Sequence, residues 1–126
     1  HKLYSTQKYE EAAKLFQTLY LLDPMDSRYA LAIGASFQMA KKYDNAIGWY
    51  LALSLIDEET PLPFYYISDC FLKLEHPIAS HEFLNKTIER CKDNPHYSNL
   101  KTRAEMMKTS LEKKMAEEST SKGAPK

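Results

Sequence analysis

The side chains best suited to bind a metal ion are two cysteines and two histidines in the second half of the chain. Cys70, His76, His81 and Cys91 follow the spacing C-x5-H-x4-H-x9-C. Zinc is held by these donors, but this spacing matches no usual zinc pattern. We therefore expect buried structural cysteines, surface histidines, and no metal or cofactor. Two cysteines are also too few for a disulfide framework, which is typical of a reducing compartment.

The sequence lacks the motifs that enzymes use. It contains no nucleophile elbow, no paired-carboxylate motif and no GxxxxGK[ST] phosphate loop. Its 17 basic and 17 acidic side chains give a net charge of zero, which argues against nucleic-acid binding. No apolar run reaches the length of about 18 residues that membrane insertion requires. We predict a non-enzymatic protein that binds neither nucleic acid nor the membrane interior.

Composition and chain breakers indicate an all-α domain. The chain has 126 residues, 44% of them hydrophobic, which fits one domain with a real core. Prolines at 24, 61 and 63, and 95 leave segments of about 35 residues, each long enough for two helices and a turn. Period-2 alternation is absent, and Ala, Leu, Lys, Glu and Met are common. Both features disfavour strands.

A repeat of 34 residues runs through the chain. The pattern Y-x-x-A-x-x-x-[FY]-x-x-L begins at Tyr9 and again at Tyr43, and a weaker third copy begins at Pro77. The helix before it repeats in the same register, with Gly34 and Ser68 as the small residues where two helices cross. A small residue lets helices approach to about 8–10 Å. This period and these small residues are the tetratricopeptide signature.

The predicted architecture is a helical-repeat solenoid of two and a half to three repeats with a C-terminal capping helix. Residues 1–93 form the repeats, 94–118 the cap and 119–126 a disordered tail. Because the chain opens on His1 rather than Met, we expect the first repeat to be truncated. Trp49 is expected to pack in the core or on the convex surface. The predicted helices are 1–6, 8–22, 27–40, 43–57, 61–74, 77–91 and 96–117.

The first helix of each repeat is expected to line a concave groove. In the helix 27–40 the core-facing set is Ile33, Gly34 and Phe37, and the groove-facing set is rotated from it. Apolar residues in that second row predict a peptide-binding surface. The predicted groove residues are Tyr4, Arg28, Leu31, Ala35, Gln38, Met39, Leu62, Tyr65, Asp69 and Leu72.

Beyond the bare repeat, the chain resembles the class II chaperones of type III secretion systems, the SycD/LcrH/IpgC-like group. The resemblance extends from about Tyr4 to the last helix. It departs in the third repeat, where Glu75-His76-Pro77 replaces the usual Gly-containing turn. The motifs that carry it are L-Y-x-x-x-K-Y-E-x-A from Leu3, F-Q-x-L from Phe16, L-D-x-x-D-S-R-Y from Leu22, G-A-x-x-Q from Gly34, Y-D-x-A-I from Tyr43 and P-F at Pro63.

The resemblance implies a cytoplasmic, ATP-independent bacterial chaperone. Its clients would be two membrane-inserting translocator proteins, held through an extended segment in the concave groove and kept soluble and unassembled before export. The family also has further N-terminal helices that contribute to dimerisation, so a homodimer through such helices is implied.

Two other functions are compatible with the same fold. A clamp for the terminal carboxylate of a heat-shock protein would need Lys, Asn and Arg on the groove face, which instead carries Leu31, Ala35, Leu62, Tyr66 and Asp69. A generic tetratricopeptide scaffold or assembly factor would differ from the chaperone only in its peptide partner.

Overall fold

The computed structural model describes the backbone of residues 2–123 and the side chains of residues 6–120. Within the described backbone there is no strand, and the all-α prediction is confirmed. The elements are α1 (Lys2–Leu22), α2 (Ser27–Met39), α3 (Tyr43–Ile56), α4 (Leu62–Lys73), α5 (Pro77–Cys91), the 3-10 turn η1 (Pro95–Tyr97) and α6 (Ser98–Gly123).

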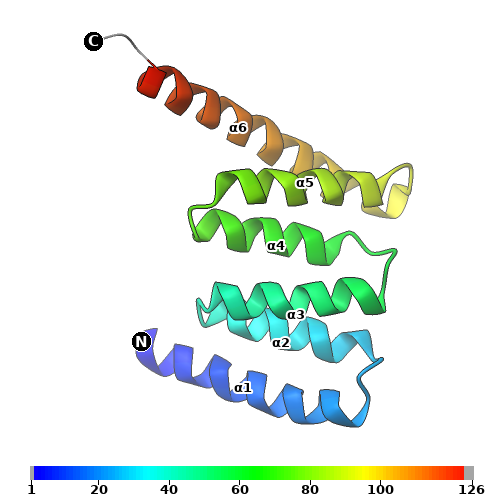
Figure 1. Ribbon diagram of the computed structural model, residues 1–126. Coiled ribbons are helices and arrows are strands. Elements are labelled where there is room, and N and C mark those ends of the chain that lie inside the picture. Colours follow the sequence, from blue (N-terminus) through cyan, green and yellow to red (C-terminus); the bar gives the residue numbers. More distant parts are fainter. Residues whose placement is uncertain (1, 124–126) are drawn as a thin grey trace.

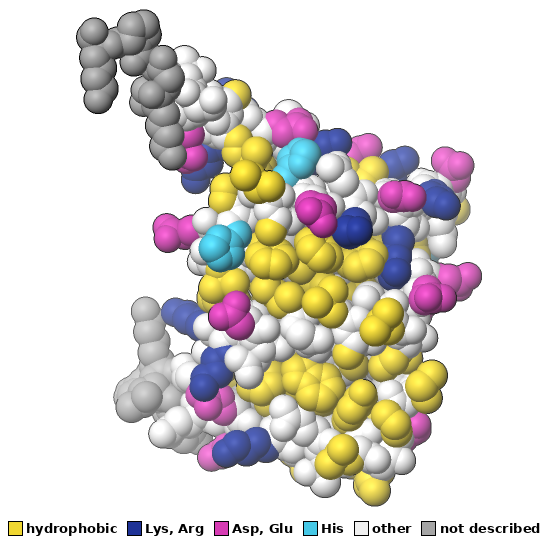
Figure 2. Space-filling view, viewed as in Figure 1, with side chains coloured by type: hydrophobic (Ala, Val, Ile, Leu, Met, Phe, Trp, Pro, Cys, Tyr) yellow, Lys and Arg dark blue, Asp and Glu magenta, His cyan; other side chains and the backbone are white. Residues whose placement is uncertain are grey.

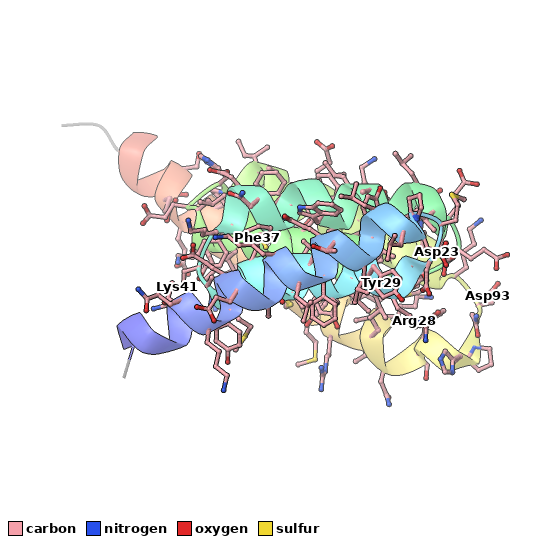
Figure 3. The ribbon with its side chains drawn as sticks, turned by 90° about the horizontal axis from the view of Figure 1, so that it is seen from below. Asp23, Arg28, Tyr29, Phe37, Lys41 and Asp93 are labelled. Atoms are coloured by element: carbon pink, nitrogen blue, oxygen red, sulfur yellow. The ribbon has the colours of Figure 1, made fainter. Side chains whose placement is uncertain are left out.

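The helices form an antiparallel stack from α1 to α6 (Figure 1). Each helix packs against the ones before and after it in the sequence. In Figure 1, α3 overlies α2, and in the view from below α2 and α3 lie side by side (Figure 3). This is the arrangement of a solenoid, in which stacked helix pairs bury a continuous core.

The core consists of two clusters along the stack. The central cluster includes Ala30, Ala46, Tyr50 and Ile67, which are all buried, as the 34-residue pattern predicts for Ala46 and Tyr50. The second cluster joins α5 to the capping helix and contains the buried Leu84, Ala104 and Leu111, with Met107 and Met115 packed against them. These four residues of α6 are spaced three and four apart, so they form one apolar face of the capping helix.

The small residues expected where helices cross are buried in the second and third copies of the repeat. Ala46 and Ser80 are fully buried, and the Ser80 hydroxyl donates to the Ser68 carbonyl at 2.8 Å. In α1 the equivalent Ala12 is partly exposed, and its neighbour Ala13 is fully buried instead. The first copy of the repeat therefore packs in a slightly different register.

The turns within the two complete repeats have the same geometry. Lys41 and Glu75 are 34 residues apart and adopt φ angles of 63° and 61°. After each turn the amide of the next residue donates to a carbonyl five residues back, from Lys42 to Phe37 and from His76 to Phe71. The Glu75-His76-Pro77 sequence thus keeps the turn without glycine, at the cost of a left-handed residue.

The structure differs from the predicted helix boundaries at both ends. Residues 1–6 and 8–22 were expected as two helices, but α1 is continuous from Lys2 to Leu22, because no Gly or Pro interrupts that segment. The predicted disordered tail begins at 119, but α6 continues to Gly123. The first helix breaker after Pro95 is Gly123, and the helix continues to that residue. Residues 124–126 lie outside the described part.

Candidate peptide-binding site

A pocket opens between α2 and α4, with α3 beneath it. On α2, Leu31, Ala35 and Gln38 follow the i, i+4, i+7 spacing that places them on one helix face. We call this the α2–α4 pocket. Its lining residues are Leu31, Ala35, Gln38, Met39, Lys41, Tyr43, Tyr50, Tyr66, Asp69 and Lys73.

A chain of hydrogen bonds forms the polar floor of the α2–α4 pocket. The Tyr50 hydroxyl donates to Gln38 Oε1 at 2.6 Å, and Gln38 Nε2 donates to Asp69 Oδ2 at 2.9 Å. Burial, with the nearby Cys70, Tyr66 and Asp69, raises the pKa of Tyr50 above its usual value, so the phenol remains a neutral donor. The network therefore fixes the orientation of the Gln38 amide, which keeps one N–H and one lone pair for a ligand.

Gly34 makes room for this network. A Cβ at Gly34 would lie 2.7 Å from Cε1 of Tyr50, closer than side-chain atoms pack. The Tyr50 ring therefore lies directly against the α2 backbone, and the residue is only 1% exposed. From this position its hydroxyl reaches Gln38 in the α2–α4 pocket.

A second pocket, the α4–α6 pocket, lies one repeat further along. Three of its residues are the 34-residue counterparts of residues in the α2–α4 pocket: Leu72 of Gln38, Leu84 of Tyr50 and Met107 of Lys73. Its lining is mostly apolar. The full set is Leu72, Ser80, Leu84, Met106, Met107, Ser110, Leu111 and Lys114.

Six of the ten predicted groove residues line these two pockets. Leu72 lies in the α4–α6 pocket. The five in the α2–α4 pocket are Leu31, Ala35, Gln38, Met39 and Asp69.

The other predicted residues lie elsewhere. Arg28 and Leu62 occupy the first turns of α2 and α4, and Figure 3 shows Arg28 at the opposite end of α2 from Lys41. The Arg28 side chain is 81% exposed and pairs with the N-capping Asp26 at 2.6 Å. Tyr65 packs on the cluster that joins α5 to α6. Tyr4 belongs to α1, but its side chain lies outside the described part.

The sequence did not indicate four lining residues, Lys41, Tyr43, Tyr50 and Lys73, and it placed both Tyr65 and Tyr66 on the groove face although only Tyr66 lines the pocket. On α2, Leu31 lines the pocket. Its counterpart one repeat later is Tyr65, but on α4 the next residue, Tyr66, lines the pocket instead. The rings of Tyr50 and Tyr66 lie 5.3 Å apart. One signal was available: a tyrosine in a buried repeat slot requires a hydrogen-bond partner.

The face turned toward the viewer in Figure 2 is also apolar. Hydrophobic side chains gather along α4 and again between α3 and α1. Trp49 of α3 packs edge-on against Tyr20 of α1 at 4.9 Å, as expected for a packing residue. The Arg90 guanidinium lies 4.2 Å from the centre of the Phe64 ring and donates to the Thr60 carbonyl at 3.0 Å, which ties α5 to the α3–α4 connection.

The four metal-donor residues do not converge. Cys70 and Cys91 are fully buried, and burial raises the pKa of the Cys70 thiol to about 12. His81 Nε2 instead pairs with Glu112 Oε2 at 2.7 Å, between α5 and α6. Across the described side chains, no group of three His, Cys, Asp or Glu is placed to hold a metal ion. None of the described helices is long and apolar enough to span a membrane.

The stacked pairs and the cleft define a tetratricopeptide repeat protein, and the tetratricopeptide repeat family model matches residues 25–58. Among curated proteins, the chain is 34% identical to the low calcium response locus protein H of Yersinia pseudotuberculosis over 104 residues. That match covers 82% of this chain and 62% of the relative. The chain thus spans about three fifths of the length of this relative.

Solved structures give the particular family. The chain is similar to the type III secretion chaperone SycD of Yersinia enterocolitica in complex with a peptide of the translocator YopD, with a TM-score of 0.80 and 31% identity over 89% of this chain and 86% of that one. It is also similar to PcrH of Pseudomonas aeruginosa in complex with the chaperone-binding region of PopD, with a TM-score of 0.80 and 27% identity over 89% and 84%. The chain belongs to this family of type III secretion translocator chaperones, as its motifs indicated.

Proposed function

We propose that this protein is a cytoplasmic type III secretion chaperone. It binds an extended segment of translocator proteins in the cleft formed by the α2–α4 and α4–α6 pockets, and it keeps these proteins soluble and unassembled before export. The observation that carries this proposal is the oriented amide of Gln38 in the α2–α4 pocket, together with the apolar α4–α6 pocket one repeat further along. SycD holding a peptide of YopD, and PcrH holding the chaperone-binding region of PopD, support it.

The cleft suits an extended peptide for a physical reason. Successive side chains of an extended chain point in opposite directions, so alternate ones enter pockets while the backbone requires a donor and an acceptor. Gln38 offers both, since Tyr50 and Asp69 occupy only one site on each end of its amide. Binding then keeps an aggregation-prone client in the bound form by mass action, so the proposed activity needs no catalytic step.

The test is co-expression of the tagged chain with the translocators of its own secretion system. Ala35→Glu places a carboxylate in the α2–α4 pocket, next to Asp69, and should abolish co-purification of the translocators while the helical content is retained. Leu55→Glu is the matched control, because Leu55 lies on α3 and is 78% exposed. If Ala35→Glu retains the translocators as wild type does, the cleft is not their binding site. If wild type retains none, the protein is a scaffold for another peptide.

A further inference from the structure

The cleft carries more positive than negative charge, although the whole chain has a net charge of zero. Lys41 and Lys73 line the α2–α4 pocket, and Lys114 lines the α4–α6 pocket. Asp69 is the carboxylate in the two linings, and its Oδ2 already accepts from Gln38. Three cations and one engaged carboxylate therefore face a segment that lies in this cleft.

The three ammonium groups are available to a ligand. All three side chains are exposed, and none pairs with a carboxylate within 4.0 Å among the described side chains. The neighbouring Lys42, by contrast, pairs with Glu10 at 3.4 Å. Lys41 and Lys73 lie at helix C-termini, where a cation also interacts favourably with the negative end of the helix dipole. That role leaves their donors free, because an ammonium group has three N–H bonds.

The two pockets of the cleft differ in the charges around them. A surface that adjoins the α4–α6 pocket, and shares Leu72, Leu111 and Lys114 with it, also carries Glu75 and Glu118. These two carboxylates make the far end unfavourable for a client anion. The electrostatics therefore give the bound segment a direction, with its acidic part on the side of α2.

We propose that the cleft selects client segments in which acidic residues lie near a large apolar residue. The apolar side chain enters the α4–α6 pocket, and the carboxylates lie beside Lys41 and Lys73. The two pockets flank α4, so they are separated by about one helix width, roughly 10 Å, which an extended chain spans in about three residues. This inference rests on the proposed function and specifies the chemistry of its client.

The test is selection from a displayed library of random peptides on the wild-type protein and on the Lys41→Glu/Lys73→Glu variant. Wild type should enrich Asp and Glu at about three residues from a Leu, Ile, Met or Phe. The variant should enrich Lys and Arg there instead. A synthetic copy of the best wild-type peptide should bind the variant about tenfold more weakly or worse, and its affinity for wild type should fall with added salt.

Matched variants separate charge from fold. Lys92→Gln removes a lysine that also has a positive φ angle, 40°, but lies in the α5–α6 connection, and it should select the same peptides as wild type. Met106→Asp alters the α4–α6 pocket at a residue that is 67% exposed, so the fold should persist while the apolar preference disappears. Circular dichroism of each variant checks the helical content.

The outcomes distinguish this inference from the proposed function. Peptides that bind in the cleft without acidic enrichment, or the same peptides on wild type and on the charge-reversed protein, would overturn the inference and leave the proposed function standing. Failure of wild type to retain any translocator on co-expression would overturn the proposed function itself.

Discussion

The two pockets occupy equivalent positions in successive repeats and differ in chemistry. In the α2–α4 pocket, Tyr50, Gln38 and Asp69 form a hydrogen-bonded floor. One repeat later, the counterparts of Tyr50 and Gln38 are Leu84 and Leu72, and the pocket is mostly apolar. The repeat therefore conserves the helix packing, while single side chains decide what each pocket can bind.

The residues at the helix crossing also differ between the two repeats, and a larger side chain at one position goes with a smaller one at the other. Gly34 leaves space for the Tyr50 ring, whereas one repeat later the counterparts of these two residues are Ser68 and the smaller Leu84. Glycine with tyrosine and serine with leucine both fill the crossing, which must pack at the density of a protein interior. Only the tyrosine brings a hydroxyl into the cleft, and a buried hydroxyl needs a partner. The polar pocket thus depends on a glycine in the core.

The largest effect is expected when Gly34 and Tyr50, at the crossing beneath the α2–α4 pocket, are replaced by the serine and leucine of the next repeat. Gly34→Ser places a Cβ 2.7 Å from the Tyr50 ring and should lower the free energy of unfolding, by about 1–3 kcal/mol. Tyr50→Leu in the same chain should recover part of that loss, with a coupling of about 1 kcal/mol. Urea unfolding of the four proteins measures the cycle. Simple additivity would show that the two positions are independent.

Exchanging the cleft residues themselves should have an asymmetric effect. Gln38→Leu leaves the Tyr50 hydroxyl and Asp69 without their shared partner, which should cost about 1–2 kcal/mol. The reverse exchange, Leu72→Gln, affects a side chain that is 39% exposed and should change stability by less than about 0.5 kcal/mol. Equal losses in urea unfolding would contradict the distinction between a polar and an apolar pocket.

The free energy of unfolding should fall at alkaline pH because of the buried Cys70 thiol next to the α2–α4 pocket. Burial raises the pKa of Cys70, which adjoins Asp69, to about 12 from 9.0. Above pH 9 the unfolded thiol loses its proton while the native thiol keeps it, so the unfolding free energy falls as pH rises, by about 1 kcal/mol at pH 10. Chemical unfolding at pH 8 and pH 10 should show a smaller loss for Cys70→Ala. The same loss in both proteins would exclude this thiol as the cause.

The smallest expected effect tests where the two repeats are alike. Lys41 and Glu75 both adopt left-handed backbone conformations in equivalent turns. Glycine adopts this conformation without the Cβ penalty, so Lys41→Gly and Glu75→Gly should each stabilise the protein, by about 0.5–1 kcal/mol. Thermal unfolding measures both. A gain at one turn and a loss at the other would show that the turns are not equivalent.

Local sequence patterns determined most of the fold. The 34-residue period predicted the helix pairs and the small crossing residues. Within each helix, the spacing of three and four residues between apolar side chains decides which face is buried, as it does in the capping helix. The two ends of the chain were less predictable. Ser, Thr and Lys near residue 119 suggest a tail by composition, but a helix that has started continues until a breaker such as Gly123.

The cleft depended on tertiary structure. The repeat identified α2 and α4 as its walls, and it placed Leu31, Ala35, Gln38, Met39 and Asp69 among the candidates. That Tyr66 rather than Tyr65 faces the α2–α4 pocket, and that Tyr50 bonds to Gln38, depends on how α2, α3 and α4 are rotated against one another. A period in sequence gives the spacing of residues along each helix. The rotation between helices is set by the side chains at the crossing, here by Gly34 and Tyr50.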